Sequence, residues 1–117
     1  MPHVTVNSNV PEAGAPDGFI TDVWQTAADA LDKDASYIVA HLQLGQNLIF
    51  GGTHEPACSI TIDTIGPTSH DKFSALAKNL TEIAQSALGI DPGRCWVRVT
   101  NFERDSWAME GIPFSER

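Results

Sequence analysis

The sequence predicts one α/β (α+β) domain in which a βαβ unit occurs twice, so that a four-stranded mixed sheet carries two helices on one face. Three observations lead to this prediction. Two segments have apolar residues at helical spacing, each lies between two segments with alternating apolar residues, and the second half of the chain repeats the order of the first. With 117 residues the chain is long enough for one domain, which we take to span residues 1–117.

The first half begins with a strand and a helix. Val4 and Val6 alternate with polar residues, which predicts a strand over residues 3–7 with one apolar face. The first helix is predicted over residues 19–31, because apolar residues recur there at the spacing of one helix face. These residues are Phe19, Ile20, Val23, Trp24, Ala27, Ala30 and Leu31. Such a helix is expected to lie on a sheet.

The next segment is uncharged. No Asp, Glu, Lys or Arg occurs from Ala35 to His54, although 19% of the chain is charged, which indicates a segment in the middle of the fold. We predict a strand over residues 37–44 and a short strand over residues 47–50. The glycines that follow, Gly51-Gly52, mark a turn.

The second half repeats the first in kind. A strand is predicted over residues 58–63, a helix over residues 73–88 that ends at Gly89, and a last strand over residues 95–100. The helix stripe consists of Phe73, Leu76, Leu80, Ile83, Ala84, Ala87 and Leu88. Connections of this length favour parallel pairing within each βαβ unit.

Two helices can cover only one face of the sheet. We expect the covered face to hold Val4, Val6, Ile38, Ala40, Leu42, Cys58, Ile60, Ile62, Val97 and Val99. The other face would hold Thr5, Val39, His41, Gln43, Ser59, Thr61, Arg98 and Thr100. That second face is too polar for a dry core and has too many β-branched and small residues for a highly charged face in solvent. We therefore predict that it faces other subunits around a wet interior, with a ring favoured over a two-fold dimer.

Composition and charge exclude several classes of protein. The net charge of −8 argues against nucleic acid or an anionic membrane as partner, since both need clustered Lys and Arg. No run is long enough for membrane insertion, and no secretory leader is visible, which makes a cytoplasmic protein the expectation. Cys58 and Cys95 form no CxxC motif and no ligand set with the four histidines, so we predict no metal and no cofactor. Both cysteines read as small buried thiols.

Pro2 is the residue with the most unusual chemistry. Removal of Met1 would leave Pro2 with a free secondary amine. An α-amino group titrates near pH 8 in water, and an apolar pocket lowers that value, so a buried N-terminal proline can act as a neutral base. The alternative is that Pro2 merely begins an edge strand, where its missing N–H costs nothing.

A set of residues along the whole chain resembles the macrophage migration inhibitory factor family of the tautomerase superfamily. The similarity runs from Pro2 to about residue 114 with almost no gaps. It rests on Pro2, Asn7-Ser8-Asn9-Val10-Pro11, Pro16-Asp17-Gly18-Phe19, Lys33, Tyr37-Ile38, His41, Phe50-Gly51-Gly52, Glu55-Pro56, Ile65-Gly66, Pro92-Gly93-Arg94 and Phe114.

The resemblance implies the tautomerase fold, a homotrimer of βαββαβ subunits, and three active sites at the subunit boundaries. It also implies a keto–enol tautomerase for small aromatic α-keto acids such as phenylpyruvate, and for dopachrome, with Pro2 as the general base. Lys33 would bind the substrate carboxylate, and Ile65, with Thr64 beside it, would form part of the pocket wall. Without the family, Lys33 reads as a solvated turn lysine.

Several positions depart from the family pattern. Trp96 stands where the family usually has a pocket tyrosine from the neighbouring subunit, and Arg98 stands in place of a pocket asparagine. Arg98 either binds the substrate carboxylate together with Lys33 or forms an ion pair with a carboxylate such as Asp63. Trp107 or Met109, with Phe114, would form an apolar lid. The family's CxxC is absent at residues 57–60, so we expect no thiol oxidoreductase activity of that kind.

A second class of function remains open from the sequence. Cytokine members of the family act outside the cell although they lack a signal peptide. Under this reading the protein would be released by a non-classical route and bind a cell-surface receptor, with a weak or vestigial pocket. The presence of Pro2 and Lys33 favours an active pocket, whereas the absence of the family's tyrosine and asparagine puts the usual substrates in doubt.

Overall fold

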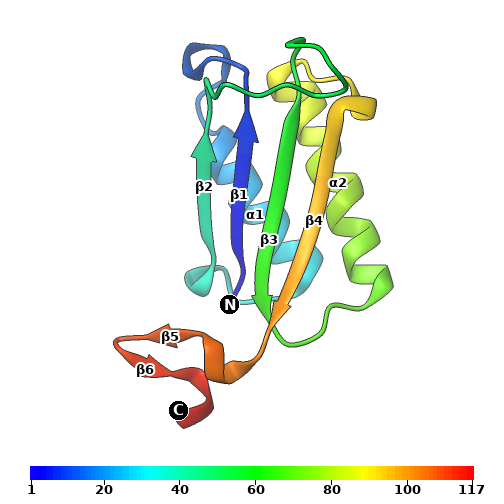
Figure 1. Cartoon of the computed structure of the whole chain (residues 1–117). Coiled ribbons are helices and arrows are strands. Elements are labelled where there is room, and N and C mark those ends of the chain that lie inside the picture. Colours follow the sequence, from blue (N-terminus) through cyan, green and yellow to red (C-terminus); the bar gives the residue numbers. More distant parts are fainter.

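The computed structural model describes all residues, 1–117, and has two helices packed on one face of a four-stranded sheet (Figure 1). The strands lie in the order β2-β1-β3-β4. Their bounds are β1 His3–Ser8, β2 Val39–Gln43, β3 Cys58–Ile65 and β4 Cys95–Phe102, and the helices are α1 Phe19–Leu31 and α2 His70–Leu88. The predicted βαββαβ architecture with a mixed sheet is therefore confirmed.

Strand pairing reflects the duplication. β1 and β2 are parallel, with Val4 opposite Ala40, and β3 and β4 are parallel, with Ile60 opposite Val97. The two βαβ units meet along β1 and β3, which are antiparallel, and there Val6 is the partner of Ile60. Each helix thus connects two parallel strands, and parallel strands need a long crossover connection of this kind.

Local sequence signals set the helix ends. α1 begins after Gly18, which has a φ of 85°, and is followed by Asp32 in the left-handed region at a φ of 53°. α2 begins three residues earlier than the predicted Phe73, because the Ser69 side chain accepts a hydrogen bond from the Lys72 N–H and caps the first turn. It ends at Gly89 as predicted.

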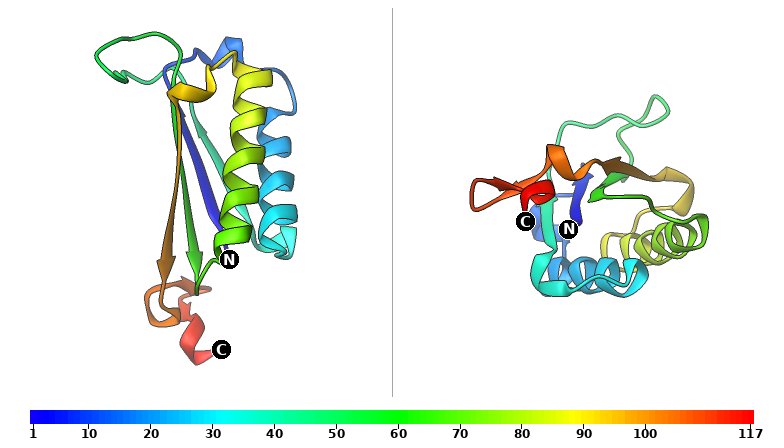
Figure 2. Two further views of the ribbon diagram at one scale, coloured as in Figure 1. Left: turned by 90° about the vertical axis from the view of Figure 1, so that its right-hand side faces the viewer. Right: turned by 90° about the horizontal axis from the view of Figure 1, so that it is seen from below.

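The hydrophobic core lies between the sheet and the helices. Val4, Val6 and Ile62 are fully buried from the sheet side, and Leu76 and Leu80 of α2 pack against them. Each such side chain contributes about 1.5–3 kcal/mol through burial. The opposite face of the sheet is uncovered, and Val39 and Trp96 on it are 54% and 60% exposed. The two views of Figure 2 show both helices on the same side of the sheet.

Two predicted strands differ from the observed ones. Residues 47–49 form no strand, and the segment has only an isolated bridge between Phe50 and Thr53. A strand needs a partner, and no other strand of the chain pairs with this segment. β2 begins at Val39 rather than Tyr37, because Ala35–Tyr37 is a 3-10 turn capped by the Asp34 side chain.

The last residues form a small unit that the sequence did not predict. β5 (Ala108–Met109) and β6 (Ile112–Pro113) make a hairpin beyond the end of the sheet near the N-terminus (Figure 1). The Trp107 ring stacks edge-on against Phe102 at 5.5 Å between centroids. Neither helix combines the length and the apolar character that crossing a membrane would need.

Candidate active site

A cavity of about 230 Å³ lies at the end of the sheet where β1 begins. Strand register explains why distant segments meet there. β1 starts where the antiparallel β3 ends, since His3 is opposite Asp63, and β4 ends beside β3, since Phe102 is opposite Ile65. The lining residues are Met1, Lys33, Asp34, Tyr37, Ile65, Arg104 and Phe114.

Pro2 is enclosed next to this cavity. Its side chain is less than 2% exposed, and its carbonyl oxygen accepts a hydrogen bond of 3.1 Å from the Val39 N–H. Met1 is attached and lines the cavity, so the Pro2 nitrogen is an amide here. Burial, and after it the positive charge of Lys33, lowers the pKa of the Met1 α-amino group below its usual value of 8.0. This place therefore favours the neutral form of a terminal amine more than water does.

Two cations line the cavity. Lys33 follows the left-handed Asp32 at the end of α1, and its backbone N–H donates to the Ala28 carbonyl at 3.2 Å. Arg104 lies in the short 3-10 turn after β4, and its Nη2 donates to the Phe114 carbonyl oxygen at 2.8 Å. Lys33 was predicted from the sequence as a residue of the site and lines this cavity. Arg104 was not predicted. Its position becomes evident only once the chain folds back after β4.

Asp34 brings a negative charge to the rim of the cavity. Hydrogen bonds from the backbone N–H and then the hydroxyl of Ser36 lower the pKa of the Asp34 carboxyl. The carboxylate is thereby engaged with its own 3-10 turn. Asp34 forms no ion pair with Lys33 or Arg104. The one ion pair in the structure joins Arg117 to Glu110.

The wall of the cavity is apolar on one side. Ile65 and Phe114 line it, and Phe114 is 6% exposed and carries the Arg117 guanidinium over its ring at 5.3 Å. Thr64 lies on the opposite side of β3 from Ile65. Its side chain is 2% exposed among the core residues under the helices, and its hydroxyl has no hydrogen-bond partner. The structure thus places Ile65 but not the Thr64 side chain at the cavity.

Trp96 and Arg98 lie away from this cavity within one chain. Trp96 is at the start of β4, at the far end of the sheet, where it helps to line a separate apolar cavity of about 300 Å³. Its ring contacts Phe50 edge-on at 5.7 Å. Arg98 lies exposed on the open face opposite Thr61, and the ion pair with Asp63 that the sequence suggested does not form in one chain.

The three predicted lid residues are also separated. Phe114 lines the cavity, whereas Trp107 packs against Phe102 and Met109 lies in β5. The structure therefore brings together Lys33, Ile65 and Phe114 beside the buried Pro2. It leaves the other predicted aromatic and basic residues outside.

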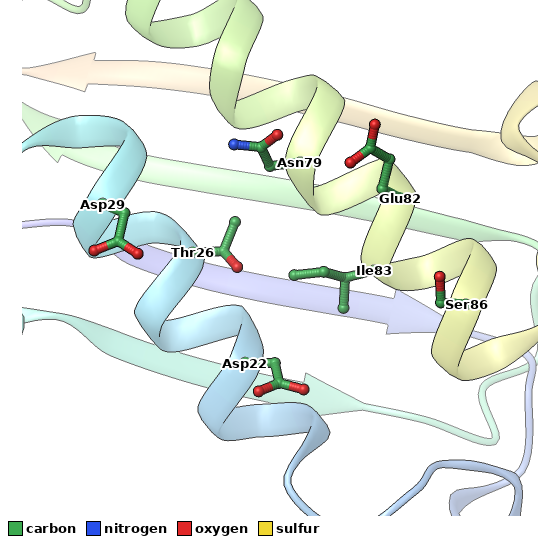
Figure 3. Close-up of a pocket in the computed structure, with 7 residues that line it drawn as sticks. All are labelled: Asp22, Thr26, Asp29, Asn79, Glu82, Ile83 and Ser86. Carbon is green, nitrogen blue, oxygen red and sulfur yellow. The ribbon is translucent and has the colours of Figure 1, made fainter.

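A larger groove of about 330 Å³ lies between the two helices (Figure 3). Asp22 and Asp29 project from α1 and Glu82 from α2, and no Lys or Arg lines the groove. Like charges in such a groove repel an organic anion, and these side chains do not form a group of three that could hold a metal. The smaller cavity has the amine, the cations and the apolar wall, so it is the better candidate for an active site.

Comparison with known proteins agrees on one family. A family model for macrophage migration inhibitory factor (MIF) matches residues 1–115. Macrophage migration inhibitory factor of Mus musculus is 30% identical over 98% of this chain and 100% of its own length. The homologue from Brugia malayi is 28% identical over 97% of this chain and 99% of its own. The solved structure of the Oncomelania hupensis factor superimposes with a TM-score of 0.92 at 25% identity, covering 97% of this chain and 82% of that one.

Proposed function

Because the chain belongs to the macrophage migration inhibitory factor family, we propose that it is a keto–enol tautomerase in which Pro2, freed by removal of Met1, is the general base. The observation that carries the proposal is the setting of the N-terminus. The terminal amine lies in a cavity where burial and Lys33 lower its pKa. Once Met1 is removed, the Pro2 amine takes that place.

The proposed reaction moves one proton within the substrate. The neutral Pro2 nitrogen takes a proton from the carbon beside the carbonyl of an α-keto acid. The protonated Pro2 then gives this proton to the carbonyl oxygen, so the enol forms and Pro2 is neutral again. In the reverse direction Pro2 takes the proton from the enol oxygen and returns it to carbon. A base for this step works best with a pKa near the working pH, which an ordinary N-terminal amine at about 8 approaches only after its pKa is lowered.

The cations give the cavity its preference for an acid. A carboxylate that enters beside Lys33 finds a second cation in Arg104, and charge-assisted hydrogen bonds to carboxylates are stronger than neutral ones. Ile65 and Phe114 offer an apolar wall for an aromatic ring. This arrangement favours small aromatic α-keto acids such as phenylpyruvate, and dopachrome, over neutral or cationic substrates. No cofactor takes part in the proposed reaction.

The proposal includes a homotrimer, in which a neighbouring subunit supplies Trp96 and Arg98 to the cavity. Three features support assembly. The open face of the sheet is half-polar and uncovered, Trp96 is 60% exposed, and residues 47–49 extend from that face without a partner strand (Figure 2). A single chain leaves Trp96 at the wrong end of the sheet, so the second copy completes the site.

A second candidate function is extracellular signalling. The mouse relative, 30% identical over nearly the whole chain, is named for the inhibition of macrophage migration. Under this reading the protein is made in the cytoplasm, leaves the cell by a non-classical route and binds a cell-surface receptor. The tautomerase cavity would then serve as a structural remnant.

The test uses phenylpyruvate tautomerisation by the wild type and by Pro2→Gly, after intact-mass measurement shows that Met1 is absent from both. Glycine replaces the rigid secondary amine of the ring with a mobile primary amine, and we expect the rate to fall at least about tenfold, of the order expected when a well-positioned general base is lost. Equal rates in the two proteins would remove Pro2 from the mechanism. Absence of turnover in both, with inhibition of macrophage migration by both, would support the signalling function instead.

A further inference from the structure

The two cysteines of the chain lie side by side on neighbouring strands. Cys58 begins β3 and Cys95 begins β4, and they are direct partners in the parallel register. Their Sγ atoms are 3.1 Å apart, although 37 residues separate them in the sequence, and both are free thiols. This pair lies at the end of the sheet opposite the cavity that holds Met1, so the proposed reaction does not use it.

The surroundings make the two sulfurs unequal. Cys58 is fully buried and its thiol donates a hydrogen bond to the Cys95 sulfur, which also accepts one from the Thr81 hydroxyl at 3.8 Å. The hydrogen bond from Cys58, helped by Thr81 and opposed by burial, lowers the pKa of Cys95 to about 7. The bond to Cys95 and burial raise the pKa of Cys58. Cys95 is thus the nucleophilic thiol of the pair.

Access also favours Cys95. It lies on β4, an edge strand of the sheet, and it is partly exposed, whereas Cys58 lies on the inner strand β3 under the helices. A small oxidant reaches the edge sulfur first. The buried Cys58 sulfur lies close enough to attack an electrophilic product formed on Cys95. This is the arrangement of an attacking and a resolving thiol, built across two strands rather than within a CxxC motif.

We infer that Cys58 and Cys95 are a redox modification site, at which a hydroperoxide oxidises the pair to a reversible intrachain disulfide. The Cys95 thiolate attacks the terminal peroxide oxygen and the O–O bond breaks, so Cys95 becomes a sulfenic acid. The leaving hydroxide, or alkoxide from an organic hydroperoxide, takes up the proton that the Cys95 thiol gave up and departs as water or an alcohol. The Cys58 sulfur then attacks the Cys95 sulfur, the S–O bond breaks, and the hydroxide leaves as water with the Cys58 proton. The two thiols supply the two electrons that reduce the peroxide. An added dithiol reduces the disulfide back to the two thiols.

The required movement is small. A disulfide needs sulfurs about 2.05 Å apart and Cα atoms about 4.4–6.8 Å apart, and neighbouring strands are spaced about 4.7–4.9 Å apart. The sulfurs at 3.1 Å therefore need to approach by only about 1 Å. Neither cysteine is in a flexible tail, because both begin paired strands of the main sheet.

The test exposes the folded full-length protein to stoichiometric hydrogen peroxide and measures intact mass. We expect the loss of two hydrogen atoms, the disappearance of both free thiols and full reversal by dithiothreitol. Trypsin should release the peptide 95–98 linked to the peptide 34–72, since each contains one of the cysteines. The same treatment in concentrated urea should form this link far more slowly, because there the two cysteines are no longer held together.

Serine variants separate the two roles. Cys58→Ser should accumulate a sulfenic acid on Cys95 that dimedone traps, because the resolving thiol is missing. Cys95→Ser should react with peroxide at least about tenfold more slowly than the wild type, because the nucleophilic thiol is missing. Circular dichroism checks that both variants fold. Oxidation of wild-type Cys95 to sulfinic acid with Cys58 still free, or disulfides only between chains, would overturn the inference. None of these measurements depends on tautomerase activity.

Discussion

The two ends of the sheet differ in chemistry. The end where β1 begins, here called the amine end, has the cavity lined by Met1, Lys33, Ile65, Arg104 and Phe114. The end where β4 begins, here called the tryptophan end, has a cavity lined mainly by apolar residues, with Trp96 exposed and no cation among its lining residues. One chain therefore has a base and cations at one end and an exposed aromatic wall at the other.

This division follows from strand direction. β1 runs antiparallel to β3, and β4 runs parallel to β3, so the first residues of β1 and of β4 lie at opposite ends. Residues assigned to a single site by resemblance, such as Pro2 and Trp96, can then meet only between chains. Under the proposed function, a complete site therefore requires assembly, whereas the terminal amine, Lys33 and Arg104 come together within one chain.

The largest expected effect is on KM and concerns Lys33 at the amine end. Lys33→Ala should raise KM for phenylpyruvate by about 10- to 100-fold with a small effect on kcat, because a hydrogen bond to a charged group contributes about 1.5–3 kcal/mol. Lys78→Ala, at an exposed position of α2, is the matched control and should leave KM unchanged. Steady-state kinetics decide the matter. An unchanged KM in Lys33→Ala would mark Lys33 as a solvated turn residue.

The second prediction concerns the tryptophan end. The Arg94 side chain donates to the carbonyl oxygens of Phe50, Thr53, Glu55 and Pro56 and lies over the Phe50 ring, which in turn contacts Trp96. Arg94→Ala should lower the free energy of unfolding in urea by about 1–3 kcal/mol, because four carbonyl oxygens lose their charged donor.

Two variants set the scale for Arg94. Arg94→Lys should restore only part of the loss, since lysine lacks the planar fork of donors. Arg117→Ala, which removes a partly exposed ion pair with Glu110, should cost less than about 1 kcal/mol. A loss in Arg94→Ala no larger than in Arg117→Ala would show that Arg94 does not hold this end together.

A third experiment tests whether the two ends join between chains. Pro2→Gly lacks the proline ring amine and Trp96→Ala lacks the aromatic wall, so each alone should be impaired at low phenylpyruvate concentration. Refolding the two together in equal amounts should restore about a quarter of the wild-type sites if neighbours in a ring share a site. The rate measured after mixing without refolding is the control. No gain after co-refolding would mean that each site belongs to one chain.

The smallest effect is a shift with pH. The pKa of the Met1 amine is lowered, and the Pro2 amine that replaces it should share this lowering. We therefore expect kcat/KM to rise with pH and level off below the value of 8 typical of a free terminus, as the neutral base becomes the main form. Lys33 contributes to the lowering after burial, so Lys33→Gln should move the inflection to higher pH. The pH profile of both proteins checks this. An inflection in the variant at or below that of the wild type would contradict the assigned cause.

Much of the fold could be predicted from alternation and helical spacing. Val4, Val6, Ile60 and Ile62 alternate strictly and are buried under the helices as expected. The same alternation explains why Thr64 does not line the cavity. Thr64 lies on the buried face of β3 together with Ile60 and Ile62, whereas Ile65 lies on the other face. The failed prediction at residues 47–50 has another cause. Composition shows that a segment suits a strand, but not whether a partner strand exists.

The site was less predictable than the fold. Pro2 has a chemical signal in the sequence, because removal of Met1 would expose a secondary amine. Lys33 has none of its own, since a turn lysine is ordinary, and only the family resemblance assigned it to the site. Arg104 has none, since its place depends on the 3-10 turn after β4 and on a hydrogen bond to the Phe114 carbonyl. The closeness of Cys58 and Cys95 likewise depends on the register of β3 and β4, which sequence spacing does not reveal.

The burial of Pro2 beneath an attached Met1 has a practical consequence for laboratory work. An affinity tag or fusion partner joined in front of Pro2 turns the proline nitrogen into an amide and fills the mouth of the cavity with extra chain. Under the proposed function, protein produced in that way would be inactive although its fold is intact. Recombinant material for assays therefore needs its tag at the other terminus, or a protease site that leaves proline first.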